Sequence, residues 1–117
     1  VGEIAWVDDE ELLNQVTAVS GGGPAYVFLL IEALAEAGRV NGLPADLAMQ
    51  LARSTVCGSG ELAYQSSESA TALRQAVMSP KGTTLEAVNV LMADDGIQPL
   101  MNRAIAAATR RSKELAG

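Results

Sequence analysis

The chain of 117 residues contains no histidine, a single cysteine and only 3% aromatic residues. Without histidine, a His-ligated metal site, a Ser-His-Asp triad and an imidazole base are all excluded. One thiol, Cys57, cannot form an internal disulfide or a cysteine-cluster zinc site. We therefore predict no metal site, and the apolar neighbours of Cys57 indicate a buried core residue rather than a nucleophile.

Basic residues and long apolar runs are scarce as well. Eight Lys and Arg stand against fourteen Asp and Glu, a net charge of −6, so we expect no nucleic-acid partner. The longest apolar run, Ala25–Ile31, is shorter than the ~18–20 residues that cross a bilayer, so we expect no membrane span. Val1–Val7 lacks the basic flank of a signal peptide, and with one thiol we expect a cytoplasmic protein.

Helix-forming residues are plentiful, because 49% of the chain is hydrophobic and alanine is the strongest helix former. The length suits one domain, and the apolar spacing predicts an all-α fold. A short strand over Val1–Val7 is either the remnant of a sheet outside the chain or a frayed end. The expected helices cover about residues 9–20, 24–39, 44–66, 69–79, 83–93 and 97–115.

The helix expected over Pro24–Arg39 is apolar on nearly every face. Glu32 and Glu36 form its one polar stripe, which we expect to be solvated. A helix of this kind must be covered on all sides, and a domain of this size can hardly supply that cover alone. The sequence therefore predicts that a second subunit or another domain covers this helix.

The helix expected over Pro44–Ser66 carries two glycines in its middle, within Gly58-Ser59-Gly60. Each glycine costs about 1 kcal/mol relative to alanine inside a helix. Either the helix kinks there or a neighbouring helix approaches closely, and the second interpretation is favoured. The residues expected to point inward from this helix are Leu47, Leu51, Val56 and Leu62.

Two glycine-containing segments are candidate ligand-binding loops, and the first of them does not fit. The run Gly21-Gly22-Gly23 lacks the G-x-G-x-x-G spacing of a dinucleotide loop, because position 26 is Tyr26, and it is interpreted as a flexible bend. The segment Ser79–Thr84 leads directly into a predicted helix, whose free N–H groups could bind a carboxylate. The alternative is a plain capped turn, since Thr83 and Glu86 have the T-x-x-E spacing of a capping box.

At these residues the sequence resembles pyrroline-5-carboxylate reductase. Ser20–Phe28 followed by Glu32-Ala33 is similar to the family's S-G-S-G-P-A-Y-x-F…E-A segment, and Gly42-Leu43-Pro44 matches its G-L-P. Ser79–Thr84 falls where the family has S-P-G-G-T-T. The resemblance covers essentially the whole chain. Gly22 and Lys81 depart from it, since they replace the second serine of the first segment and the first glycine of the G-G pair.

The resemblance implies the C-terminal half of such an enzyme. Residues 1–8 would end an N-terminal Rossmann domain or form a linker, and residues 9–117 would form a helical dimerisation and substrate domain. That domain interlocks with its twin in a homodimer, and dimers of the family often assemble into rings. NADPH or NADH would be bound mainly by the N-terminal domain, which lies outside this chain, so the cofactor-binding residues are unknown.

The implied reaction, in proline biosynthesis, is reduction of 1-pyrroline-5-carboxylate to L-proline with NAD(P)H. By resemblance, Ser79, Gly82 and Thr83 would hold the substrate carboxylate. Thr84 would complete the substrate site and act as the catalytic residue, with its hydroxyl facing the ring nitrogen. Without the cofactor domain, the chain alone is expected to be inactive. The alternative function is a helical dimerisation module without catalytic activity.

Overall fold

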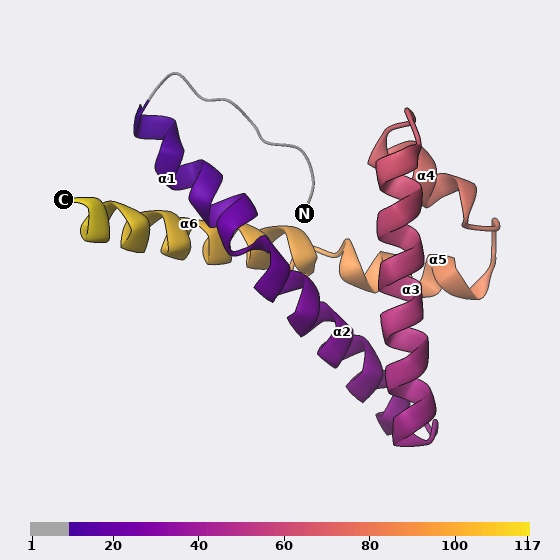
Figure 1. Ribbon diagram of the computed structural model, residues 1–117. Coiled ribbons are helices and arrows are strands. Elements are labelled where there is room, and N and C mark those ends of the chain that lie inside the picture. The colour runs from indigo at the N-terminus through magenta and orange to yellow at the C-terminus, as the bar shows by residue number, and fades with distance from the viewer. Residues whose placement is uncertain (1–9) are drawn as a thin grey trace. The chain divides into compact units, whose positions relative to one another are not determined.

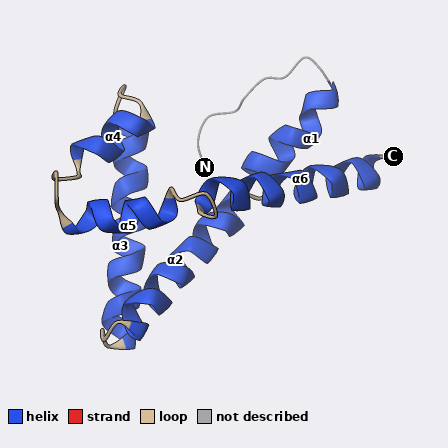
Figure 2. Cartoon of the chain, turned by 180° about the vertical axis from the view of Figure 1, so that it is seen from behind, coloured by secondary structure: helices blue, strands red, loops and turns tan. Residues whose placement is uncertain are grey.

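The structure is a computed structural model that describes residues 10–117 (Figure 1). All regular elements in that range are helical, so the all-α class is confirmed (Figure 2). The strand expected over Val1–Val7 lies outside the described residues. The elements are η1 (Glu10–Leu12), α1 (Leu13–Val16), the π-helical η2 (Thr17–Gly21), α2 (Gly23–Val40), α3 (Ala45–Gln65), α4 (Ala70–Ala76), α5 (Thr83–Leu91) and α6 (Ile97–Ala116).

The described residues fall into two compact units, one comprising residues 10–24 with 91–117 and the other Ala25–Val90. In the first unit α1 and η2 pack against α6 (Figure 1). The hydroxyl of Ser112 on α6 donates a hydrogen bond of 2.7 Å to the side-chain oxygen of Asn14 on α1. Ala18, at 2% exposure, is the buried residue of this packing. A short side chain there allows the helices to approach closely.

The glycine run does contain a bend, at Gly22 alone, between two helical elements. Thr17–Gly21 forms a π-helical turn, and the N–H of Gly22 donates to the carbonyl of Thr17 at 3.2 Å. Gly22 keeps helical angles (φ −85°, ψ −12°), and α2 begins at the next residue. Pro24 is tolerated because the first N–H groups of a helix have no intrahelical acceptor. The glycines therefore widen the helix locally instead of ending it.

Because the bend at Gly22 does not end the helical path, Leu13–Val40 forms one helical stretch of 28 residues with a mean hydropathy of 1.4 in its most apolar window. By length and composition it could cross a membrane, which the run Ala25–Ile31 alone did not indicate. The core helix of a soluble protein meets the same criterion. Length and composition alone therefore do not distinguish a lipid from a protein as its covering partner.

In the second unit, α2 and α3 form an antiparallel hairpin through a tight turn, as the sequence predicted at Asn41–Pro44. Gly42 has φ +110°, a left-handed conformation that glycine adopts without steric cost. The N–H of Leu43 donates to the carbonyl of Gly38 at 3.0 Å and closes the end of α2. Pro44, with φ −57° and ψ 142°, precedes α3 as its N-cap.

The contact between α2 and α3 is made by small residues. Ala35, Ala48 and Ala52 are buried at 7%, 3% and 5% exposure, and Ile31 packs against them. A Cβ added at Gly38 would lie 3.4 Å from the Cβ of Ala48, so this position also keeps the helices close. This alanine core was not predictable from the sequence, because alanine is common in any helix and gives little hydrophobic pattern.

Five expectations about α3 are corrected accordingly. Leu47, Leu51 and Leu62 are 41%, 47% and 49% exposed, Cys57 is also exposed, and Val56 is only half-buried. The alanines take the buried positions, because two helix axes can approach more closely over a methyl group than over a leucine side chain. The leucines are left on a face that no helix of the unit covers.

The glycines of α3 have no neighbour in the described chain. α3 continues as a regular helix through Gly58 and Gly60, so it does not break there. No atom lies within 4 Å of a Cβ built at either glycine. The close neighbour that the sequence predicted is therefore not a helix of the described chain.

The remaining helices follow the sequence signals with shifted ends. Ser69 caps α4, because its hydroxyl oxygen accepts a 3.0 Å hydrogen bond from the N–H of Ala72. α4 ends at Ala76, three residues before the expected end at Ser79. α5 ends at Leu91 instead of Ala93, and α6 covers the range expected for the last helix.

Candidate functional site

The loop between α4 and α5 contains all the residues predicted to bind substrate. The N–H of Gly82 donates to the carbonyl of Ser79 at 2.9 Å, which closes a four-residue turn with Pro80 and Lys81 in the middle. Lys81 has φ +65° and is the one non-glycine residue with positive φ among residues 10–117. Turns with proline second and a left-handed third residue favour glycine at that third position. Lys81 replaces the first glycine of the family's G-G pair, so the substitution falls at the position of the turn that glycine would suit best.

Gly82 is constrained by the loop itself. A Cβ at this position would lie 3.0 Å from the carbonyl oxygen of Ser79 and 3.2 Å from its Cβ. Contacts this short force the neighbouring atoms to shift, so a side chain at position 82 would distort the turn. Glycine at position 82 therefore avoids a tight contact with Ser79 inside the turn.

Thr83 and Thr84 are the first two residues of α5. The backbone N–H groups of a first helical turn have no intrahelical acceptor, and they lie at the positive end of the helix dipole. The side chains of Ser79, Thr83 and Thr84 are exposed. The loop therefore presents three hydroxyl-bearing residues and a helix N-terminus to solvent, a combination that can bind a carboxylate. Glu86 also lies in this first turn, as the capping alternative requires.

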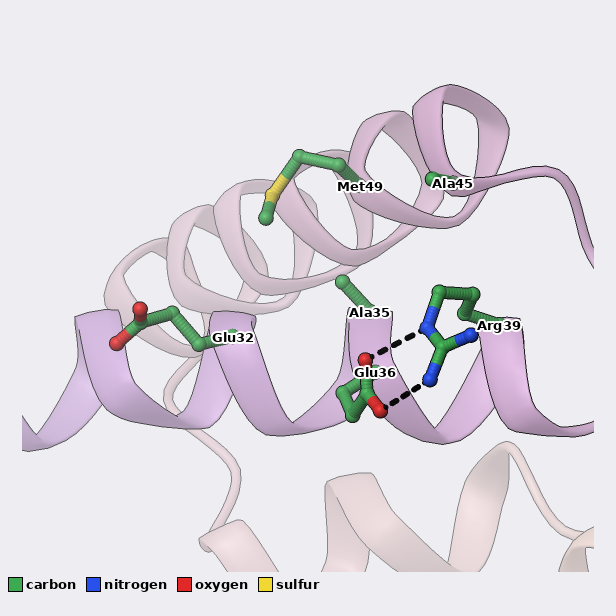
Figure 3. Close-up of a pocket in the computed structure, with 6 residues that line it drawn as sticks. All are labelled: Glu32, Ala35, Glu36, Arg39, Ala45 and Met49. Atoms are coloured by element: carbon green, nitrogen blue, oxygen red, sulfur yellow. Dashed lines mark hydrogen bonds and ion pairs between the residues drawn. The ribbon is translucent and has the colours of Figure 1, made fainter.

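The α2–α3 hairpin has two grooves of different chemistry. The first, of about 340 Å³, is charged and lies beside Ala35 (Figure 3). Within it, the carboxylate of Glu36 accepts hydrogen bonds of 2.8 and 2.7 Å from the Nε and Nη2 of Arg39. The hydrogen bond from Arg39 lowers the pKa of Glu36 below its ordinary value, although both side chains are exposed. The polar stripe predicted from Glu32 and Glu36 is found on this side.

The second groove, of about 150 Å³, contains no charged residue. Helical periodicity places Leu34 of α2 and Leu51 of α3 on the side of the hairpin away from Glu36 and Arg39. Apolar and small side chains form both walls and the floor. The lining residues are Leu34, Gly38, Leu43, Ala48, Leu51, Ala52 and Thr55.

Large apolar side chains of α2 also remain uncovered within the chain. Phe28 and Leu29 are each 63% exposed, and Leu30 is 46% exposed. This bears out the prediction that the helix needs cover from outside the domain. Large apolar side chains exposed next to one another on a helix are typical of an interaction site.

Comparisons with known proteins agree on one family. The model described as pyrroline-5-carboxylate reductase dimerisation matches residues 10–115. A pyrroline-5-carboxylate reductase of Pseudomonas aeruginosa is 43% identical over 99% of this chain and 42% of its own length. One from Pisum sativum is 44% identical over 98% of this chain and 41% of its own length. The chain thus spans about two fifths of the length of these relatives.

Two solved structures share the fold. A pyrroline-5-carboxylate reductase from Coxiella burnetii superposes with a TM-score of 0.91 at 42% identity, over 98% of this chain and 42% of that one. A pyrroline carboxylate reductase from Plasmodium falciparum, solved with NADP bound, gives a TM-score of 0.84 at 34% identity. It covers 93% of this chain and 41% of its own. The arrangement of helices is therefore one that solved reductases contain.

Proposed function

This chain belongs to the pyrroline-5-carboxylate reductase dimerisation family, and we propose that it is the dimerisation and substrate-loop part of such a reductase. The reaction is the NAD(P)H-dependent reduction of 1-pyrroline-5-carboxylate to L-proline, a step of proline biosynthesis. The observation that carries the proposal is the family match over residues 10–115. The exposed loop with three hydroxyl-bearing residues at the start of α5 supports it chemically.

Substrate binding is assigned to the loop that the Ser79–Gly82 turn closes. Ser79, Gly82 and Thr83 hold the substrate carboxylate through hydroxyl and backbone N–H donors at the N-terminus of α5. Thr84, in the same helical turn, directs its hydroxyl to the ring nitrogen. A bound NAD(P)H would supply a hydride to the carbon of the protonated imine, and the C=N π electrons would become a lone pair on the ring nitrogen, which keeps its proton. Such a step depends on orientation more than on a strong base, so a site without histidine can support it.

The cofactor is assigned to a part of the protein outside this chain. In residues 10–117 the glycine run is helical, so its backbone does not form the strand-to-helix turn that binds a dinucleotide. The reductase from Plasmodium falciparum is described with NADP bound, which supports NADPH or NADH as the reductant here. The residues that select between the two dinucleotides would lie in that other part.

A homodimer is the assembly that the uncovered helices favour. The description of the family model as a dimerisation domain supports it, and two copies would bury the apolar surface of α2 and α3 from water. Assembly of dimers into rings and a cytoplasmic location belong to the same proposal. A dimerisation module without catalytic activity remains the second candidate, because residues 10–117 contain no strand-to-helix turn of the kind that binds a dinucleotide.

Complementation of the isolated chain tests the proposal. The chain would be mixed with NADPH and 1-pyrroline-5-carboxylate, and nicotinamide absorbance would be followed with and without a separately expressed Rossmann domain. We expect no turnover by the chain alone and turnover once the Rossmann domain is added. If the full-length protein also fails to reduce the substrate, the non-catalytic module is the correct function. Turnover by the chain alone would contradict the assignment of the cofactor.

A further inference from the structure

The loop that the Ser79–Gly82 turn closes carries one charged side chain, that of Lys81. It is the one Lys or Arg in the sequence between Arg74 and Arg103. The residue is exposed, and within residues 10–117 its ammonium forms no hydrogen bond or ion pair. The positive charge is therefore available to a ligand that approaches the loop.

Lys81 occupies the position of the turn that suits a side chain least. Its φ of +65° lies in the left-handed region, which glycine enters freely and a residue with a Cβ enters at a cost. No side-chain contact of Lys81 with a charged or polar group of the described chain offsets this cost. Residues held in sparsely populated backbone conformations cluster at active sites and ligand clamps. What lysine adds over glycine here is a positive charge on a flexible four-carbon stem.

The other donors of the candidate substrate site are uncharged. They are the hydroxyl groups of Ser79, Thr83 and Thr84 and the backbone N–H groups at the start of α5. Glu86 lies in the same first turn of α5 and adds a negative charge, which repels a carboxylate. An ammonium in the loop offsets this repulsion, and a charged donor forms stronger hydrogen bonds to a carboxylate than a neutral one does.

Resting on the function proposed above, we propose that Lys81 is a substrate-affinity residue, whose ammonium attracts the carboxylate of 1-pyrroline-5-carboxylate toward the hydroxyl groups of the loop. The substrate carries one carboxylate, and an ammonium on a flexible stem can reach such a group without a fixed geometry. The ammonium contacts neither the imine carbon nor the ring nitrogen, so it acts on binding and not on hydride transfer. Lysine at position 81 thus lowers the stability of the turn and raises the affinity for a carboxylate.

Three substitutions at position 81 separate the charge from the backbone conformation. Lys81→Asn removes the charge but still suits the left-handed region, which asparagine enters more readily than most residues do. Lys81→Arg keeps the charge. Lys81→Gly removes the charge and the unfavourable conformation together, so it should bind substrate less well although its fold is more stable. Arg110→Gln is the matched control, because it removes one positive charge at an exposed position of α6, outside the loop.

Steady-state kinetics of the full-length protein would measure the KM for 1-pyrroline-5-carboxylate and the KM for NADPH. We expect Lys81→Asn and Lys81→Gly to raise the substrate KM about twofold to fivefold, the range of a solvent-exposed ion pair, with little change in kcat or in the KM for NADPH. Lys81→Arg and Arg110→Gln should keep a substrate KM near that of the wild type. Salt at about 1 M shortens the Debye length to about 3 Å, so it should reduce the difference between Lys81→Asn and the wild type.

Three outcomes would overturn the inference while the proposed function stands. These are an unchanged substrate KM in Lys81→Asn, an equal rise in Arg110→Gln, and a rise confined to the KM for NADPH, which would assign the cation to the cofactor. Far-UV circular dichroism would check that each variant is folded, and Lys81→Gly replaces Lys81→Asn if the latter does not fold. A full-length wild type that fails to reduce the substrate would overturn the proposed function itself, and this inference with it.

Discussion

The Ser79–Thr84 loop and the α2–α3 hairpin differ in how far the chain itself determines their structure. The loop is closed by its own backbone, through the bond from Gly82 to Ser79, and its hydroxyl-bearing residues remain open to a small ligand. The hairpin buries only alanines and leaves its leucines exposed. A local hydrogen bond therefore closes the loop of the candidate substrate site, whereas the α2–α3 hairpin leaves large apolar side chains uncovered within the described chain.

The largest effect should come from a charge on the uncovered side of the hairpin. Leu30 is 46% exposed in the chain and lies on the same side of α2 as Leu34. In a dimer that covers this side, Leu30→Asp buries an unpaired charge, which costs about 3 kcal/mol or more. We expect light scattering to give the monomer mass, or the protein to unfold, at concentrations where the wild type is dimeric.

The control for this variant is Glu32→Asp, which keeps a carboxylate in the charged groove and should leave the mass unchanged. A dimer of Leu30→Asp as tight as the wild type would show that this part of α2 faces water. The need for a dimer partner would then no longer distinguish the hairpin from the loop.

The next effect concerns catalysis at the loop. Thr84→Ala removes one hydroxyl from the site without changing the backbone, so the melting temperature should stay close to that of the wild type. Loss of a positioned hydrogen bond of about 1–3 kcal/mol lowers kcat/KM about fivefold to 150-fold in the full-length enzyme. Thr71→Ala, an exposed threonine in α4, is the matched control. Kinetics equal to those of the wild type would remove Thr84 from the proposed mechanism.

Features that local geometry determines were predictable from the sequence, whereas the burial of individual side chains was not. The turn at Gly42, the α5 start at Thr83 and the extent of α6 were all predictable, because glycine, proline and capping residues act through local geometry. The inward-facing residues of α3 were wrong, since leucine spacing shows which side is apolar but not whether this chain or another covers it. The continuous helix through Gly22 was missed because a π-turn has no distinct sequence signal.

A smaller, opposite pair of effects should appear in the turn. Gly82→Ala places a Cβ 3.0 Å from the carbonyl oxygen of Ser79, so it should destabilise the fold by about 1–3 kcal/mol. Lys81→Gly relieves a left-handed conformation, φ +65°, and should stabilise it by about 0.5–1 kcal/mol net of the added backbone entropy. Urea denaturation would measure both. If both variants stabilised the fold, or both destabilised it, the result would contradict the turn geometry.

The smallest effect is expected at the ion pair of Glu36 and Arg39 on the charged side of the hairpin. The hydrogen bond from Arg39 lowers the pKa of Glu36, so any stabilisation by this carboxylate is fully present above its unfolded-state pKa. It is lost as the pH falls through the lower folded-state pKa. Both side chains are exposed, and salt screens such a pair. The melting temperature of Glu36→Gln at neutral pH should therefore barely differ from that of the wild type, and any difference should disappear in acid or high salt. A large loss of stability or of dimer affinity would mean that a partner covers the charged side of the hairpin.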